Sequence, residues 1–240
     1  MTINTEATDR KIRSLVIAGE NNHDWKRSTP FVEDLLEALD DFFVDRTETP
    51  SPTLENPDIG DKYDLFFLDY NGSPWSEEAR ENFAAAVREG TGVTALHAAN
   101  NAFYGWETYE EMLGLLWRDE ADHGEYHELT VSIEDWDHPV RAGFDDFDLW
   151  DELYHGLTNP QDVSYDVLAT AYSDPDTGGT GQDEPVVPTR ECGAGRIFHS
   201  ILGHVWSLQT MRTFENKQFQ KLLVRGSEWA ATGEVTAHDA

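Results

Sequence analysis

The sequence predicts an α/β fold organised around a doubly wound, mainly parallel β-sheet, with antiparallel strands added in the second half of the chain. Apolar runs at residues 12–18, 63–69 and 92–96 have the continuous character of parallel strands that are buried on both faces. Helical patterns separate these runs, and strands that alternate with helices favour one sheet with right-handed crossovers. From about residue 128, apolar and polar residues alternate in short runs, which is typical of antiparallel strands.

The elements of the first half follow from local signals. A polar loop at residues 20–25 comes directly after the first strand, which stops at Gly19. Thr29 and Pro30 have the pattern of an N-cap and a first helical residue, so we expect a helix to begin there. The other elements expected in this half are a strand at 42–46, an exposed proline-containing loop at 47–60 and an amphipathic helix at 76–89.

The turn at His97 is the centre of the predicted fold. The short apolar strand at residues 92–96 follows the glycines that end the preceding helix, and it stops abruptly at His97, Asn100 and Asn101. Ligands bind at the carboxyl ends of the strands in open α/β sheets. We therefore expect His97 to face a ligand site.

The second half is expected to add antiparallel pieces to the parallel core. The expected elements are strands at 129–133 and 165–172, a hairpin formed by 186–189 and 196–201 around Cys192, and a final helix at 214–231. No Pro/Gly/Ser-rich linker divides the chain, which predicts a single domain over residues 1–240.

The charge of the chain is strongly acidic. There are 47 acidic residues against 17 basic ones, and the formal net charge is −30. Self-repulsion on this scale destabilises a compact fold in dilute salt, whereas molar salt shortens the Debye length to roughly 3 Å and screens most of it. The eight Trp, twelve Phe and eight Tyr argue against a disordered acidic protein. The composition therefore predicts a halophilic, folded protein.

Charge and hydrophobicity also limit the partners. An acidic surface without a basic stripe repels phosphates, so nucleic acid is not expected as a partner. No apolar run approaches the roughly 20 residues of a membrane span, and the polar start of the chain has no signal-peptide pattern, so we expect a cytoplasmic protein without a membrane partner. The single cysteine, Cys192, excludes an intrachain disulfide and is interpreted as structural. A homo-oligomer is compatible with the sequence.

Polar loops supply the candidate catalytic residues. His23, His97 and His204 all come just after apolar strand-like runs, so in a parallel sheet they converge on one edge. A neutral imidazole there can act as a general base or as a metal ligand, and Glu152 is the candidate carboxylate partner. We expect His97, Glu152 and His204 to be catalytic. The same three residues could bind Zn²⁺ with one open position, but acids are so abundant that a nearby carboxylate is weak evidence, and the cofactor stays open.

The same loops supply candidate substrate-binding residues. Their imidazoles and amides can position hydroxyl groups, and their aromatic rings offer flat faces on which sugars stack. For Trp106 and Tyr109, three residues apart on a helix, packing in the core is an equal alternative. The candidates are His23, Asp24, Trp25, Asn100, Asn101, Trp106, Tyr109, His123 and Tyr154.

Other motifs give weaker evidence of a functional site. His123 and His127 have the spacing of two zinc ligands on a helix, but Gly124 and the strand that begins nearby argue against a helix, so zinc through this pair is not expected. The sequence has no Gly-x-Ser-x-Gly motif, no phosphate-binding glycine loop and no dinucleotide fingerprint.

Taken together, these motifs resemble the trehalose-utilisation (ThuA-like) family. The segments that carry the resemblance are residues 22–25, 92–99, 106–109, 113–114, 137–140, 151–154 and 195–204, together with His123. It extends over about residues 12–231, the expected core of the domain. The resemblance implies a class I glutamine amidotransferase-like fold, which is a flavodoxin-like α/β sandwich. It also implies a role in the catabolism of trehalose and related disaccharides or their 3-keto derivatives.

The sequence departs from this pattern in two ways. Amidotransferases of this fold carry a cysteine nucleophile at the strand-to-helix turn, where this chain has Leu96 and His97, so glutamine hydrolysis through a thioester is not expected. ThuA-like sequences tend to have a tyrosine where His199 stands and a polar residue where Val205 stands. Two hypotheses follow: an enzyme that acts on a small sugar or keto-sugar by hydrolysis, isomerisation or elimination, and a non-catalytic sugar-binding or regulatory module.

Overall fold

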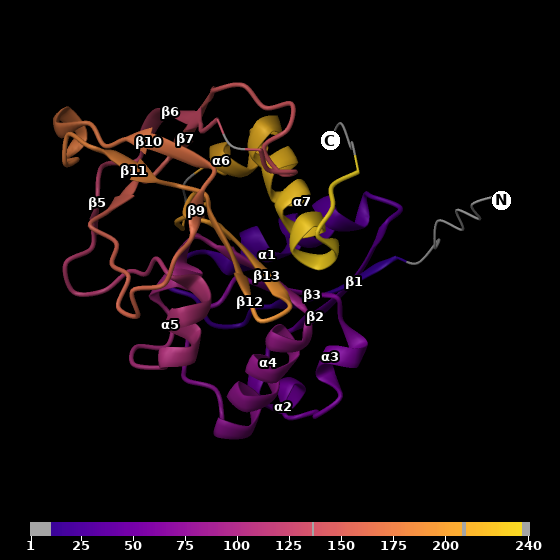
Figure 1. The fold of residues 1–240 in the computed structure, drawn as a ribbon. Helices are drawn as coiled ribbons and strands as arrows, with labels where there is room; N and C mark the ends of the chain where they lie inside the picture. Colours follow the sequence, from indigo (N-terminus) through magenta and orange to yellow (C-terminus); the bar gives the residue numbers. More distant parts are fainter. Residues whose placement is uncertain (1–10, 136, 208–209, 237–240) are drawn as a thin grey trace.

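The centre of the molecule is a seven-stranded sheet (Figure 1). The computed structural model describes residues 11–135, 137–207 and 210–236. The strands of the central sheet lie in the order β2 (Phe42–Thr47), β1 (Ile12–Ile17), β3 (Leu65–Leu68), β4 (Gly92–Leu96), β13 (Gly195–Ser200), β12 (Pro188–Cys192) and β9 (Asp166–Val167). All neighbours from β2 to β13 are parallel, whereas β12 is antiparallel to both β13 and β9.

Helices cover both faces of this sheet (Figure 1). Because successive side chains of a strand point to opposite faces, each strand contributes to two apolar clusters. Val16 of β1 packs in the cluster on one face, whereas Leu15 and Ile17 pack in the other. The first cluster contains residues of α1 (Trp25–Glu37) and α7 (Lys217–Thr232), and the second contains residues of α2 (Pro50–Leu54), α3 (Ile59–Lys62), α4 (Glu77–Glu89) and α5 (Glu107–Leu113). The predicted doubly wound, mainly parallel sheet is confirmed.

The second half adds antiparallel sheets, as predicted. A four-stranded sheet has the order β11 (Asp183–Pro185), β10 (Ala169–Tyr172), β6 (His127–Ile133) and β7 (Phe147–Asp151), and β5 (Asp122–His123) pairs with β8 (Tyr154–His155). In Figure 1 the four-stranded sheet lies above the central one, beside α6 (Arg212–Glu215). The segment that leaves β7 brings Glu152 to the site described below.

Local sequence explains where the helices around the site begin and end. The Ser76 hydroxyl accepts a hydrogen bond from the backbone N–H of Ala79 and caps α4, which ends at Gly90 in a positive-φ conformation. The side chain of Asn216 caps α7 in the same way. Gly92 lets β4 approach α7 closely, because a β-carbon there would lie 2.2 Å from the Ala230 carbonyl oxygen.

Two expectations for the first half were wrong. Helix α1 begins at Trp25, so Pro30 lies inside it, and Thr29 is not its N-cap. The hydroxyls of Ser28 and Thr29 donate instead to the buried carboxylate of Asp69, a partner that only the tertiary fold supplies. The expected exposed loop at 47–60 contains α2 and the start of α3, because Pro50 stands at the beginning of a helix, where proline is well tolerated.

Other boundaries differ in the second half and after β4. The expected strand at 165–172 is split between β9 in the central sheet and β10 in the four-stranded one. The expected final helix is divided into α6 and α7 at Asn216, whose side chain starts the second helix. The turn after β4 is a 3₁₀ helix, His97–Asn101, that precedes α5. The predicted hairpin around Cys192 is confirmed as β12 and β13.

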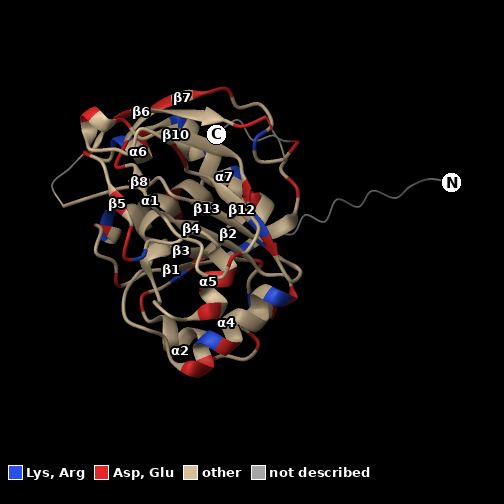
Figure 2. Cartoon of the chain, turned by 60° about the vertical axis from the view of Figure 1, so that its left-hand side comes forward, with Lys and Arg blue, Asp and Glu red and all other residues tan. Residues whose placement is uncertain are grey.

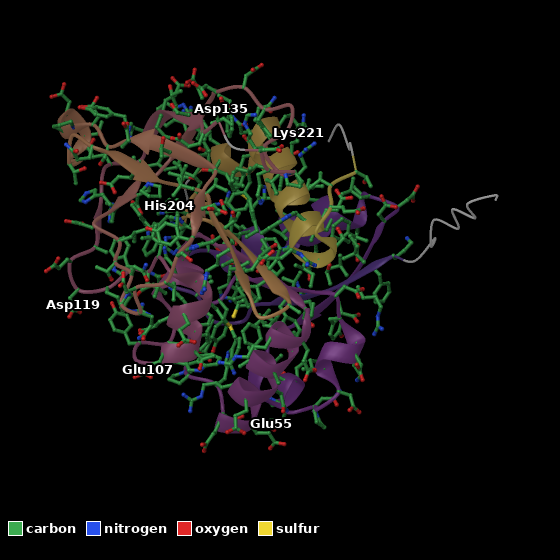
Figure 3. All side chains as sticks on the ribbon, in the orientation of Figure 1. Glu55, Glu107, Asp119, Asp135, His204 and Lys221 are labelled. Carbon is green, nitrogen blue, oxygen red and sulfur yellow. The ribbon has the colours of Figure 1, made fainter. Side chains whose placement is uncertain are left out.

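Acidic side chains are distributed over helices, strands and loops (Figure 2). Glu107, Asp119 and Asp135 are exposed at the periphery, whereas His204 lies in the interior (Figure 3). None of the described helices is long and apolar enough to cross a membrane.

Candidate functional site

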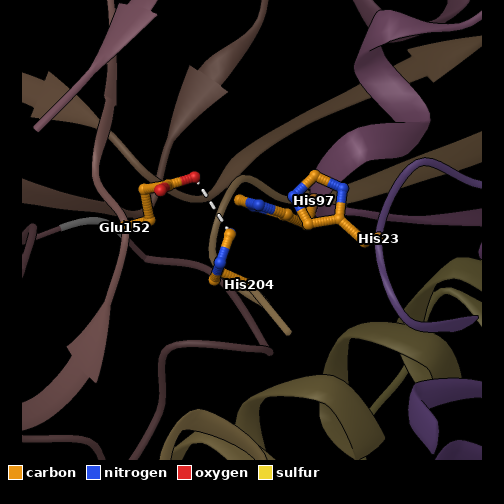
Figure 4. Close-up of side chains that lie close together, drawn as sticks. All are labelled: His23, His97, Glu152 and His204. Carbon is orange, nitrogen blue, oxygen red and sulfur yellow. Dashed lines mark ion pairs between the residues drawn. The ribbon is translucent and has the colours of Figure 1, made fainter. Parts of the chain in front are cut away.

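Three histidines and one glutamate meet at the carboxyl edge of the parallel strands (Figure 4). His23 follows β1, His97 follows β4, His204 follows β13, and Glu152 follows β7 of the second sheet. One side-chain nitrogen or oxygen of each residue lies within 4.8 Å of the corresponding atoms of the other three. We call these four residues the histidine–glutamate cluster. Their predicted convergence is confirmed.

His97 is held in a constrained turn. Its φ is 43°, a left-handed conformation that costs a residue with a β-carbon about 1–2 kcal/mol. Its Nδ1 is 2.6 Å from the carbonyl oxygen of Ile201, and its ring stacks on Tyr154 at a centroid distance of 4.2 Å. Because a carbonyl only accepts, Nδ1 carries the hydrogen, and Nε2 has a free lone pair. This Nε2 is buried and has no hydrogen-bond partner among the described residues.

His204 and Glu152 form the closest pair of the cluster. Nδ1 of His204 lies 2.9 Å from a carboxylate oxygen of Glu152, which is the dashed contact in Figure 4. The other oxygen of Glu152 lies 3.2 Å from Nδ1 of His123. The Glu152 side chain is only 15% exposed. The carboxylate therefore lies between the imidazoles of His204 and His123 and differs from the exposed acids that dominate the surface.

A second carboxylate, Asp151, fixes the backbone on both sides of this pair. It is fully buried and accepts hydrogen bonds from the backbone N–H groups of Glu152 at 2.7 Å, Gly203 at 2.8 Å and His204 at 3.1 Å. Burial raises the pKa of Asp151 to about 6, while the charge of His204 and these three N–H groups oppose the shift. Asp151 does not face the cavity, so we interpret it as a positioning residue.

The imidazoles of His23 and His97 are held neutral by their surroundings. Burial, with the charges of His204 and His123, lowers the pKa of His23 to about 3. Burial, with the neighbouring His23 and His204, holds the pKa of His97 well below its ordinary value. Nδ1 of His23 lies 3.0 Å from the side-chain oxygen of Asn22, which leaves its Nε2 as the acceptor. Neutral imidazoles at neutral pH can accept a proton or bind a metal ion.

A cavity of about 400 Å³ opens above the cluster. Its lining residues are Asn22, His23, Asn101, Trp117, His123, Glu152, Tyr154, His204 and Trp206. His97 is only 2% exposed and lies beneath this lining. Burial, together with Glu152 and Asp151, raises the pKa of Tyr154 well above its ordinary value, so its hydroxyl stays a donor. The cavity therefore combines flat aromatic faces with hydrogen-bonding groups.

Two of the predicted substrate-binding residues belong to the core. Trp106 and Tyr109 stack on each other at 5.5 Å; Tyr109 is buried in the apolar cluster on the α4 and α5 face of the sheet, and Trp106, which is partly buried, packs against it. The Tyr109 hydroxyl donates to the Ala99 carbonyl oxygen at 2.8 Å. Of the two alternatives left open for this pair, packing in the core is the observed one.

The other predicted residues divide between the cavity and its surroundings. His23, Asn101, His123 and Tyr154 line the cavity. Asp24 and Trp25 line a smaller neighbouring hollow of about 300 Å³, which shares Asn22, His23 and Trp206 with the main cavity. Asn100, within the turn after β4, is fully buried and does not line the cavity.

His123 and His127 stand on β5 and β6 and not on a helix, as expected. The Nδ1 of His127 lies 2.6 Å from the Glu125 carbonyl oxygen, and among the described residues His127 belongs to no group suited to a metal.

Sequence reasoning missed three lining residues. Trp206 stands two residues after His204, and Asn22 directly precedes His23. The same reasoning that identified the polar loops after the strands could therefore have identified both residues. Trp117 follows α5 in a segment that carries no local signal of a site. The Trp117 ring lies against Tyr154 at 4.5 Å, a contact between segments far apart in the chain.

This fold and site define an α/β protein with a histidine-lined cavity at the carboxyl edge of its sheet. The family model for trehalose utilisation, ThuA, matches residues 13–230, and the chain belongs to this family. Its mainly parallel sheet is flavodoxin-like and is consistent with the class I glutamine amidotransferase-like fold that the resemblance implied.

Solved structures agree with this assignment. A putative ThuA-like protein from Parabacteroides merdae is 34% identical, with a TM-score of 0.86 over 95% of this chain and 93% of that chain. A putative ThuA-like protein from Bacteroides uniformis is 17% identical, with a TM-score of 0.71 over 95% and 94%. The cytoplasmic protein STM3548 from Salmonella typhimurium is 14% identical, with a TM-score of 0.64 over 91% and 99%. The last two show likeness of fold alone. No curated protein matches the sequence.

Proposed function

We propose that this protein is a cytoplasmic enzyme of carbohydrate catabolism that acts on trehalose, on a related disaccharide or on a 3-keto derivative of one. The observation that carries the proposal is the histidine–glutamate cluster at the floor of a cavity of about 400 Å³. This volume lies within the roughly 300–1,000 Å³ typical of small-molecule sites. The family description of trehalose utilisation supports the substrate class.

The lining residues suit a sugar. The rings of Trp117, Tyr154 and Trp206 offer apolar faces, and the amides of Asn22 and Asn101 can donate to and accept from hydroxyl groups. Aromatic faces supply apolar contact, and the polar groups beside them can fix the orientation of a bound ligand.

The cluster supplies the chemistry in this proposal. His204 is paired with Glu152, and a carboxylate beside an imidazole stabilises the imidazolium that forms when the ring takes up a proton. His204 lines the cavity and therefore moves protons at the reacting carbon or oxygen, and His97 acts with it from beneath the lining. Alternatively, the two imidazoles would hold a metal ion there. His23, Tyr154 and Asn101 hold hydroxyl groups of the substrate.

Thiol chemistry is not part of the proposal. The turn after β4 offers Leu96 and His97, and Cys192 stands in the hairpin that precedes β13. That hairpin is at the amino end of β13, whereas His204 lies beyond its carboxyl end. Burial also raises the pKa of Cys192, which keeps the thiol protonated and poorly nucleophilic.

The test is incubation of the protein with 3-keto-trehalose, trehalose and glucosides, with and without added divalent metal ions, followed by product analysis. An enzyme loses turnover but keeps most of its sugar binding when His97 is replaced by Asn. His127→Asn, outside the cavity, is the matched control and should leave turnover unchanged. Sugar binding without any turnover in the wild-type protein would instead identify a non-catalytic sugar-binding module.

A further inference from the structure

We propose that the histidine–glutamate cluster binds one divalent transition-metal ion through imidazole nitrogens of His23, His97 and His204 and a carboxylate oxygen of Glu152. The proposal deepens the function proposed above, and the catalytic meaning of the ion rests on that function. The binding itself depends only on the four residues and can be measured without a substrate.

The spacing of the ligand atoms fits one ion. All four lie within 4.8 Å of one another. Ligands held at roughly 2.1 Å from a tetrahedral ion stand about 3.4 Å apart, so the longest separation between ligand atoms needs to shorten by about 1.4 Å. The ring centroids agree with a common focus: His23 is 4.7 Å from His97 and 4.9 Å from His204.

The hydrogen bonds of the imidazoles point their free nitrogens at this focus. A metal-binding histidine commonly donates its other N–H to a carbonyl or carboxylate, which fixes the tautomer and the ring orientation. His97 does so with the Ile201 carbonyl oxygen, and His23 does so with the side-chain oxygen of Asn22. Asp151 fixes the backbone of Glu152 and His204 by accepting hydrogen bonds from their N–H groups.

An unsatisfied nitrogen is the independent sign of a ligand. Nε2 of His97 is buried, belongs to a side chain that is 2% exposed, and has no hydrogen-bond partner among the described residues. Leaving such a group without a partner costs about 1–3 kcal/mol. A metal ion at the focus of the cluster removes this cost and also explains why the chain keeps His97 in a left-handed turn.

The donor set selects the kind of ion. Three nitrogens and one oxygen suit Zn²⁺ and the neighbouring first-row ions, whereas Mg²⁺ and Ca²⁺ prefer oxygen ligands. His23, His204 and Glu152 also line the cavity, so any further coordination position of the ion faces a bound substrate. When bound, such an ion supplies Lewis-acid polarisation of a keto or hydroxyl oxygen.

The surface acids do not account for the site. Exposed carboxylates on a chain of net charge −30 attract many cations weakly. In contrast, the cluster contains one carboxylate that is only 15% exposed and three imidazoles from three different loops. A saturable binding site whose affinity depends on these four residues can therefore be distinguished from cations that the acidic surface attracts weakly.

The experiment is titration calorimetry with Zn²⁺ and, separately, Mg²⁺ on the full chain, purified without a histidine tag and treated with a chelator in molar KCl. Metal content by mass spectrometry gives the stoichiometry, and Co²⁺ absorption in the visible range reports the ligand geometry. We expect one Zn²⁺ per chain and no comparable Mg²⁺ site.

Variants assign the ligands. We expect Glu152→Gln and His204→Gln to weaken Zn²⁺ binding by more than roughly 100-fold, since replacement of outer-shell partners alone costs about 10–100-fold. His127→Gln, a histidine outside the cluster, is the control and should bind like the wild type. Circular dichroism separates lost binding from lost folding, and the near-isosteric Glu152→Gln keeps the test valid if a histidine variant unfolds.

Two results would overturn the proposal: no saturable Zn²⁺ site, or a site that survives Glu152→Gln and His204→Gln unchanged. Turnover without a saturable Zn²⁺ site would mean that the sugar-processing function stands and the metal proposal fails. Stoichiometric Zn²⁺ binding without turnover on any sugar would mean that the metal proposal stands and the sugar-processing function fails.

Discussion

Replacement of Asp151 by Asn should weaken both the fold and the site. The carboxylate accepts three backbone N–H groups, with Glu152 and His204 on one oxygen and Gly203 on the other. Asparagine keeps one acceptor oxygen and sets an NH₂ group against the N–H of Gly203. A lost hydrogen bond to a charged group costs about 1.5–3 kcal/mol, and a buried unsatisfied donor costs about 1–3 kcal/mol.

One effect opposes this loss. Burial raises the pKa of Asp151 to about 6, so the charged carboxylate itself carries a desolvation penalty that asparagine avoids. The net expected loss is about 2 kcal/mol of unfolding free energy, or roughly 4–8 °C in melting temperature for a chain of this size. Because Asp151 positions Glu152 and His204, Zn²⁺ affinity should also fall by about 10–100-fold.

Urea unfolding in molar KCl and zinc calorimetry measure the two effects. Asp148→Asn is the matched control, because it makes the same charge change at an exposed position of the same strand, β7. It should change stability by no more than about 0.5 kcal/mol. If Asp151→Asn behaves like Asp148→Asn in both measurements, the assignment of Asp151 as a positioning residue is wrong.

Three further predictions concern acid, salt and the thiol. Burial lowers the pKa of His199 to about 3, and its ring nitrogens have no hydrogen-bond partner among the described residues. As the pH falls below about 6.5, His199 therefore binds a proton in the unfolded chain but not in the native state. The free energy of unfolding decreases over this range. His199→Leu should reduce the loss between pH 6.5 and 4 by roughly 3 kcal/mol in urea titrations, and an unchanged pH profile would contradict the buried neutral state. The melting temperature should rise steeply from low to molar KCl because screening relieves repulsion within a chain of net charge −30, and a flat curve would refute the halophilic interpretation. Cys192→Ser should leave turnover and the circular dichroism spectrum unchanged. A variant that folds but is inactive would indicate that the thiol takes part in the reaction.

Local patterns anticipated most of the architecture. The runs that became β1, β3 and β4 are continuous and apolar because the sheet covers them on both faces, and this property is visible in single segments. The errors arose where a side chain has a distant partner. Thr29 has the pattern of an N-cap, yet its hydroxyl donates to Asp69, forty residues further along the chain. A local rule cannot recognise such a partner.

The convergence of His23, His97 and His204 was predictable from sequence for a physical reason. Parallel strands in one sheet present their carboxyl ends at the same edge, so residues that follow such strands meet whatever the details of packing. Glu152 is different, because it belongs to another sheet and its place beside these histidines came from the family resemblance. The carboxylate contact with His204 was seen only in the structure.

The sequence by itself determined the α/β class, the family and the edge of the sheet at which the site lies, since each depends on repeated local patterns and on the direction of the strands. Only the tertiary structure decided which aromatic rings face the cavity. Trp106 and Tyr109 pack in the core, whereas Trp117 and Trp206 line the site. It also decided that Asp151 bonds the backbone of Gly203 and His204, residues 52 and 53 positions away. Such contacts depend on how separate elements pack against each other, and no periodicity within either segment encodes that arrangement.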